Sequence, residues 1–213
     1  MRLAEKTIEL TFCSQLTLLW GISLFWFVLT QKQEAQAGFD AAARLGGRLF
    51  ILQFKASQHV VTSGRRFHAP HTQMSNLIQR CRGPRSIFYV LPALGTTLEI
   101  AGDIDLVSRS WLLDVNDLRG VSPPVTPWNT PRKRGSHYFD LSPPEVLIHD
   151  PLYERKVFPA TALPRLGQDS GMPLEGLAEE GFDGFWSKRT RFTGTVSALV
   201  VPSQTAALPQ ANQ

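Results

Sequence analysis

Cysteine is scarce in this chain of 213 residues, where Cys13 lies in an apolar stretch and Cys81 lies in an arginine-flanked segment. Two cysteines so placed cannot build a disulfide framework, and they do not provide the paired spacing of zinc ligands. We therefore expect a reduced protein in the cytoplasm.

Several enzyme motifs are missing as well. No Gly-x-x-x-x-Gly-Lys segment is present to hold a nucleotide phosphate, which argues against intrinsic ATP hydrolysis. No Gly-x-Ser-x-Gly segment supports a serine hydrolase. The histidines lack the i, i+4 spacing and the cysteine partners of a zinc site, so we expect loop or surface positions for His68, His71, His137 and His149.

Charged side chains are absent from Leu10 to Gln31, a run long enough to consider a membrane span. Its hydroxyl, amide and glycine residues are equally typical of a buried helix followed by a buried strand. We expect a helix from Glu5 to about Leu19 packed on a sheet, with Trp20–Leu29 entering that sheet. A single-pass membrane anchor is the alternative, and no convincing cleavage site indicates a secretory signal.

The overall composition fits one substantial core followed by a smaller extension, since 43% of the residues are hydrophobic and 19% are charged. Lys and Arg number 22 against 18 Asp and Glu, which gives a net charge of +4. This balance is compatible with a polyanionic partner.

A double glycine, Gly46-Gly47, separates two predicted strands, Gly38–Ala43 and Arg48–Lys55. The second strand is an apolar run typical of the centre of a sheet. A loop rich in Gly, Arg and His follows at 63–68. Helical spacing of apolar residues then predicts a helix over Thr72–Cys81.

The strongest strand signal of the chain is Ser86–Leu91, which is β-branched and aromatic and is followed by Pro92. A helix or a pair of strands is expected over Leu98–Val115. We assign residues 1–115 to an α/β core.

Prolines dominate the next part, which we assign as an irregular elaboration over residues 116–202. Short strands are expected at His137–Phe139 and Val146–Ile148. Residues 203–213 are expected to form a mobile tail.

The predicted hairpin carries the chemistry. Asp40 belongs to one strand, and Gln53 and Lys55 belong to its partner, so a carboxylate, an amide and an ammonium group can share one point. Gln53 interrupts an apolar run, and a buried amide there needs polar partners such as its neighbours Asp40 and Lys55.

This arrangement resembles the PD-(D/E)XK restriction-endonuclease-like superfamily over roughly residues 5 to 92, in its Gln-x-Lys subset. Asp40, Gln53 and Lys55 match the Asp, the Glu/Asp/Gln and the Lys of the motif, and the upstream glutamate is Glu34 or Glu9. The resemblance implies a three-layer core around a mixed central sheet. A neutral Gln53 departs from the usual acid, so Glu34 is needed to restore a second negative charge. The proline that often precedes the motif's Asp is missing.

The resemblance also implies a nuclease that uses Mg²⁺ or Mn²⁺ and cleaves phosphodiester bonds, most naturally in DNA. Metal ligands would be Glu34, Asp40 and Gln53, or the Phe54 carbonyl in place of the amide. Lys55 would orient the attacking water or stabilise developing charge.

A basic surface of Arg65, Arg66, Arg80 and Arg82 is expected to track nucleic-acid phosphates, although solvated loop charges would read the same way. A role in defence or in mobile-element processing, with a companion protein or as a homodimer, follows by analogy with the superfamily. The alternative is a catalytically inactive member of the fold that acts as a binding or assembly subunit.

Overall fold

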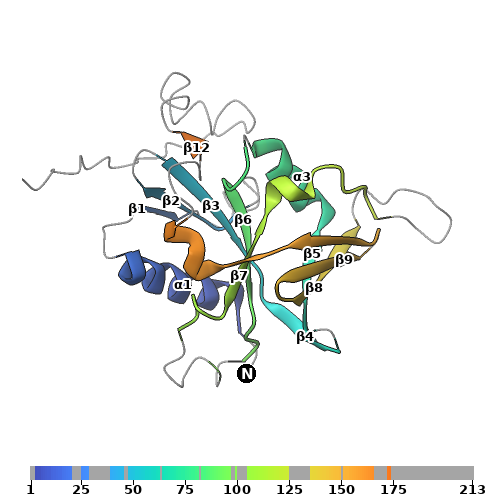
Figure 1. The fold of residues 1–213 in the computed structure, drawn as a ribbon, viewed down its shortest axis with the longest axis horizontal. Coiled ribbons are helices and arrows are strands. Elements are labelled where there is room, and N and C mark those ends of the chain that lie inside the picture. The colour runs from blue at the N-terminus through green and yellow to red at the C-terminus, as the bar shows by residue number, and fades with distance from the viewer. Residues whose placement is uncertain are drawn as a thin grey trace, which may run out of the picture. The chain divides into compact units, whose positions relative to one another are not determined.

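A computed structural model describes residues 3–20, 25–28, 39–45, 48–62, 64–81, 83–96, 99, 105–124, 135–149, 151–165 and 172–173. The chain divides into two compact units, Met1–Gly176 and Leu177–Gln213, and the described residues all belong to the first unit. The first unit is a mixed α/β fold with two α-helices and two sheets among these residues (Figure 1).

The first sheet is mixed and has seven strands, in the order β1-β2-β3-β6-β7-β11, with β12 also paired to β3. Its strands are β1 (Phe25–Val28), β2 (Ala41–Leu45), β3 (Arg48–Phe54), β6 (Ile87–Pro92), β7 (Ser110–Asp114), β11 (Phe158–Pro159) and β12 (Met172–Pro173). Strand β3 runs antiparallel to β2 and parallel to β6.

A parallel pair requires a long crossover between its strands, and here the crossover contains helix α3 (His71–Arg80). The helix forms where Met74 and Leu77 recur on one face, and both are buried. Strand β6 is buried along its whole length, as a β-branched and aromatic segment in the middle of a sheet should be.

Helix α1 (Glu5–Trp20) packs against the first sheet through a stripe of fully buried residues, Ile8, Phe12 and Leu16. Their i, i+4 spacing places them on one helix face. The rings of Phe12 and Phe54 meet edge to face, with centroids 5.4 Å apart. Burial of each of these side chains contributes roughly 1.5–3 kcal/mol, so α1 is held close to the end of β3.

The second sheet is antiparallel and has five strands in the order β10-β9-β8-β5-β4. Its strands are β4 (Ser57–Val61), β5 (Gly64–Pro70), β8 (Ser136–Ser142), β9 (Glu145–His149) and β10 (Tyr153–Lys156). Tyr89 of β6 and Phe139 of β8 meet in a T-shaped contact with ring centroids 5.4 Å apart, which joins the two sheets.

Two 3₁₀ helices complete the described elements, η1 (Val115–Leu118) and η2 (Ala160–Arg165). Asp114 caps η1 by accepting a hydrogen bond from the Asn116 amide. In the part of the chain that the structure describes, no helix is both long and apolar enough to cross a membrane.

Most expected elements are present. The helix expected from Glu5 is α1, the segment after it contributes β1, and the hairpin around the double glycine is β2–β3, in which Leu45 pairs with Arg48 across residues 46–47. The loop expected at 63–68 is wrong, because those residues except the undescribed Ser63 belong to β5, where Phe67 and Ala69 are buried.

The boundary expected at residue 115 does not separate two sheets. Strand β8 pairs with β5, and β11 pairs with β7, so segments from both sides of that position share hydrogen-bonded ladders. Residues 203–213, expected as a tail, lie outside the described residues.

Candidate active site at the end of the β2–β3 hairpin

The hairpin register places Asp40 beside Gln53. Asp40 directly precedes β2, and its amide donates a hydrogen bond to the Leu52 carbonyl at 3.2 Å. Gln53 Nε2 and the Phe54 amide both donate to Asp40 Oδ2, each at 2.6 Å. The structure therefore brings together the acid and the amide that the sequence analysis paired.

Burial dominates the electrostatics of Asp40 and raises the pKa of its carboxyl group from 3.8 to about 7. The hydrogen bond from Phe54 and the charge of Lys55 act in the opposite direction, while the charge of Glu5 adds to the increase in pKa. A carboxyl group of this kind takes up a proton near neutral pH unless a cation replaces that proton.

Gln53 is 1% exposed, and its side-chain nitrogen is fully used, since it donates to Asp40 and to the Phe54 carbonyl. Its oxygen is different. Among the described residues, three buried side-chain polar atoms lack a hydrogen-bond partner, namely Gln53 Oε1, Gln73 Oε1 and Tyr89 OH. An unpaired buried acceptor costs about 1–3 kcal/mol, so Gln53 Oε1 is available to a donor or a cation.

Lys55 follows β3 directly and is 5% exposed. Its amide donates to the Val90 carbonyl at 3.1 Å, which anchors it to β6. Its Nζ lies 3.8 Å from Glu5 Oε1, and the same Glu5 oxygen accepts a hydrogen bond from the Ala56 amide at 3.2 Å. The charge of Lys55 acts on the Asp40 carboxyl group, to which Gln53 donates its hydrogen bond.

The helix acid at this site is Glu5, which the sequence analysis did not select. Glu34 lies outside the described residues, so its predicted role stays a prediction. Glu9 is 3% exposed and forms an ion pair with Lys6 Nζ at 2.8 Å. The available sequence signal was the position of Glu5 in the first turn of an apolar helix, one turn before Glu9.

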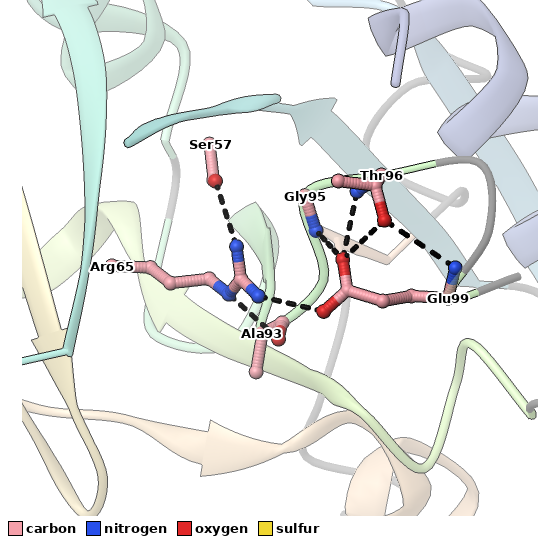
Figure 2. Close-up of polar contacts among 6 residues, drawn as sticks. All are labelled: Ser57, Arg65, Ala93, Gly95, Thr96 and Glu99. Carbon is pink, nitrogen blue, oxygen red and sulfur yellow. Dashed lines mark hydrogen bonds and ion pairs between the residues drawn. The ribbon is translucent and has the colours of Figure 1, made fainter. Parts of the chain in front are cut away.

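The arginines predicted to bind nucleic acid have internal partners where the structure describes them. Arg65 pairs with Glu99 at 2.8 Å (Figure 2), and Arg66 makes two contacts of 2.6 Å with the Asp140 carboxylate. Arg80 ends α3, and Arg82 is outside the described residues. Their phosphate contacts stay predictions, and Arg65 and Arg66 have structural roles in any case.

The surface assignment of the histidines is wrong for His71 and His137. His137 is fully buried and His71 is 9% exposed, and their Nδ1 and Nε2 atoms lie 2.8 Å apart. Ser75 Oγ lies 3.2 Å from the other ring nitrogen of His71. Burial lowers the pKa of His71, which favours a neutral imidazole in this chain of hydrogen bonds.

The chemistry available at the hairpin end comes from two carboxylates, an amide oxygen and an ammonium group. Oxygen donors of this kind suit Mg²⁺ or Mn²⁺. No group of three or more His, Cys, Asp or Glu residues that could hold a metal occurs within the described ranges, so a metal here would depend on the amide oxygen, a backbone carbonyl and water as well as the acids.

Comparisons with known proteins found no matching family model, no similar curated protein and no similar solved structure.

Proposed function

We propose that this protein is a metal-dependent nuclease that cleaves phosphodiester bonds in DNA, with its active site at the end of the β2–β3 hairpin. The observation that carries the proposal is the contact of 2.6 Å between Gln53 and Asp40 at the hairpin end, where Lys55 lies 3.8 Å from Glu5 and the charges of Lys55 and Glu5 act on the Asp40 carboxyl group.

The residues fit a divalent cation. The buried, unpartnered Gln53 Oε1 is the observation that supports the fit, because Mg²⁺ and Mn²⁺ accept amide oxygens as ligands. Asp40 and Gln53 would hold the ion, and Glu5 would add a second carboxylate. When bound, such an ion neutralises phosphoryl oxygens and lowers the pKa of its water.

The role proposed for Lys55 is that of a hydrogen-bond donor to the reacting groups. Its ammonium group is buried and lies 3.8 Å from Glu5, and its charge acts on the Asp40 carboxyl group, so it can donate a hydrogen bond to an attacking water or to a phosphoryl oxygen that gains negative charge. In a buried setting such a donor stabilises a developing charge more strongly than it would in water.

The order of the elements supports the resemblance to the PD-(D/E)XK superfamily. Helix α1, strand β2 after Asp40, strand β3 before Lys55, helix α3 and strand β6 occur in this order along the chain, with β1 between α1 and β2 and with β4 and β5 between β3 and α3. We propose that these elements form its three-layer core and that Glu5 supplies a carboxylate from α1, while the role expected for Glu34 or Glu9 stays a prediction.

The test is cleavage of a supercoiled plasmid with Mg²⁺ or Mn²⁺. Asp40→Ala and Lys55→Ala should each lower the rate about a hundredfold or more. Lys156→Ala, which changes an exposed lysine of β10, is the matched control and should retain the wild-type rate. An inactive wild-type protein, or site variants that retain the wild-type rate, would contradict the proposal.

A binding or assembly subunit without catalysis is the second candidate, and the neutral Gln53 favours it. Calorimetry separates the two functions. Binding of Mn²⁺ that is lost in Asp40→Ala supports the nuclease, whereas a protein that binds DNA or a partner but no metal supports the subunit.

A cytoplasmic location fits the two free cysteines, and recovery without detergent tests it.

A further inference from the structure

Arg65 of β5 binds three segments at once (Figure 2). Its Nε donates to the Ala93 carbonyl at 2.8 Å, its Nη1 lies 3.4 Å from Ser57 Oγ, and its Nη2 pairs with Glu99 Oε1 at 2.8 Å. The Arg65 side chain is 19% exposed and that of Glu99 is 34% exposed, so water reaches the pair only in part.

The second oxygen of Glu99 holds the loop that follows β6. Glu99 Oε2 accepts hydrogen bonds from the Gly95 amide at 2.8 Å, the Thr96 amide at 2.8 Å and the Thr96 hydroxyl at 2.9 Å. These bonds and the Arg65 charge hold the pKa of Glu99 below its ordinary value, so the carboxylate is charged at neutral pH.

The loop in turn holds the start of α1. The Gly95 carbonyl accepts a hydrogen bond from the Leu3 amide at 3.2 Å, two residues before Glu5. Leu3 and Leu94 are each 4% exposed and belong to the same buried cluster. Arg65 also reaches Ser57, two residues after Lys55.

Gly95 is needed for the close approach of the guanidinium group. A Cβ atom at this position would lie 2.4 Å from Arg65 Nη1 and 3.2 Å from Ser57 Oγ. A side chain there would push the guanidinium group away from its partners, which indicates that the loop and Arg65 are fitted to each other.

We propose that Arg65 and Glu99 are positioning residues that fix Glu5 against Lys55, by tying the loop after β6 to the start of α1 on one side and to Ser57 on the other. This proposal rests on the proposed function for its catalytic meaning. Its structural content is independent of cleavage, because the Leu3 and Ala56 amides report directly on the two linked segments.

The test measures hydrogen exchange of single amides by NMR in the full chain. Glu99→Gln and Arg65→Lys should raise the exchange rates of the Leu3 and Ala56 amides about tenfold, because the first variant removes the ion pair and the second removes guanidinium contacts to Ala93 and Ser57, so local opening breaks fewer interactions. The amide of Phe139 in β8 should keep its wild-type rate, which distinguishes lost positioning from general destabilisation.

The matched control is Arg155→Lys. Arg155 Nε donates to the Asp117 carbonyl at 2.7 Å, as Arg65 Nε donates to Ala93, but it joins β10 to η1. This variant should leave the Leu3 and Ala56 amides unchanged. If Glu99→Gln exposes all amides, the milder Arg65→Lys variant decides.

A cleavage assay of the same variants tests this proposal separately from the proposed nuclease function. If the wild-type protein is active, Glu99→Gln and Arg65→Lys should each lower kcat about tenfold or more with little change in KM, because they disturb the reacting groups rather than substrate binding. Unchanged exchange at Leu3 and Ala56 with normal cleavage overturns the positioning role alone. If these amides exchange faster in the variants but the wild-type protein does not cleave DNA, the nuclease proposal alone is overturned.

Discussion

At the scale of single residues, the raised pKa of Asp40 makes the stability of the metal-free protein depend on pH. Between its ordinary pKa of 3.8 and the folded value of about 7, the folded chain binds the proton more tightly than the unfolded chain. The stabilising contribution is therefore complete below the lower value and is lost as the pH rises through the upper value.

Asp40→Asn removes this titration. Relative to wild type, the variant should gain up to roughly 4 kcal/mol in free energy of unfolding when the pH is raised from about 4 to about 8 in EDTA. Urea denaturation at the two pH values measures the gain. A difference between the two proteins that does not change with pH would contradict the burial of this carboxyl group.

Gln53→Glu restores the acid that the superfamily motif usually has. Without metal, the new carboxylate would face Asp40 Oδ2 across the 2.6 Å contact now made by Nε2, so the variant should melt at a lower temperature in EDTA. Mn²⁺ at about a hundred times its Kd should then stabilise it by about 2.7 kcal/mol.

The matched control is Gln73→Glu on α3, which also changes an amide whose oxygen is buried without a partner. Thermal melting with and without Mn²⁺ compares the two variants. A stabilisation of Gln53→Glu by Mn²⁺ that is no larger than that of wild type and Gln73→Glu at the same Mn²⁺ concentration would contradict a metal contact of the new carboxylate.

The sequence predicted part of the site for a simple reason. Asp40 directly precedes β2, Gln53 belongs to β3 and Lys55 directly follows β3, so their places relative to one another depend on the register of one local hairpin. The contact of Glu5 with Lys55 joins positions fifty residues apart and depends on how α1 packs, which no local pattern specifies.

At the scale of elements, apolar patterns predicted α1 and α3, each of which buries one helix face, and β3 and β6, each of which is a continuous apolar run with successive buried side chains. The sequence analysis did not predict strand β5, because its arginines, histidine and glycine are typical of a loop. Its inward residues Phe67 and Ala69 alternate with outward polar residues, so the strand period was present under a loop-like composition.

At Gly64, strand β5 depends on a residue that has no side chain. Its φ is +139°, and a Cβ atom would lie 1.9 Å from the Leu141 carbonyl oxygen of β8. Gly64→Ala should therefore destabilise the fold by more than about 2 kcal/mol. Gly83→Ala, where nothing lies within 4 Å, should change stability by less than about 0.5 kcal/mol.

Chemical denaturation of the two alanine variants measures this difference. Equal stabilities would mean that β5 and β8 do not approach at Gly64 as described, and the pairing of Arg65 with Leu141 would then need revision.

At the scale of the whole molecule, described strands that follow residue 115 pair with strands that precede it. Strands β8 and β11 each complete a sheet begun earlier in the chain. Composition suggested a boundary at residue 115, but long-range strand pairing is set by tertiary packing and leaves little trace in composition.

The net charge of +4 predicts that DNA binding depends on salt. If about four phosphates are neutralised, affinity should fall about a hundredfold between about 50 and 200 mM salt, because counterions are released on binding. Fluorescence anisotropy with a labelled duplex measures the slope. Affinity that does not change with salt would contradict binding through phosphates.

The most direct test of the central claim is a Mn²⁺ titration followed by NMR, because the paramagnetic ion broadens signals of nearby amides. The account predicts that the amides of Asp40, Phe54 and Lys55 broaden first, and that this selectivity is lost in Asp40→Ala. Broadening that is absent, or that begins instead at the second sheet, would contradict a metal site at the end of the β2–β3 hairpin.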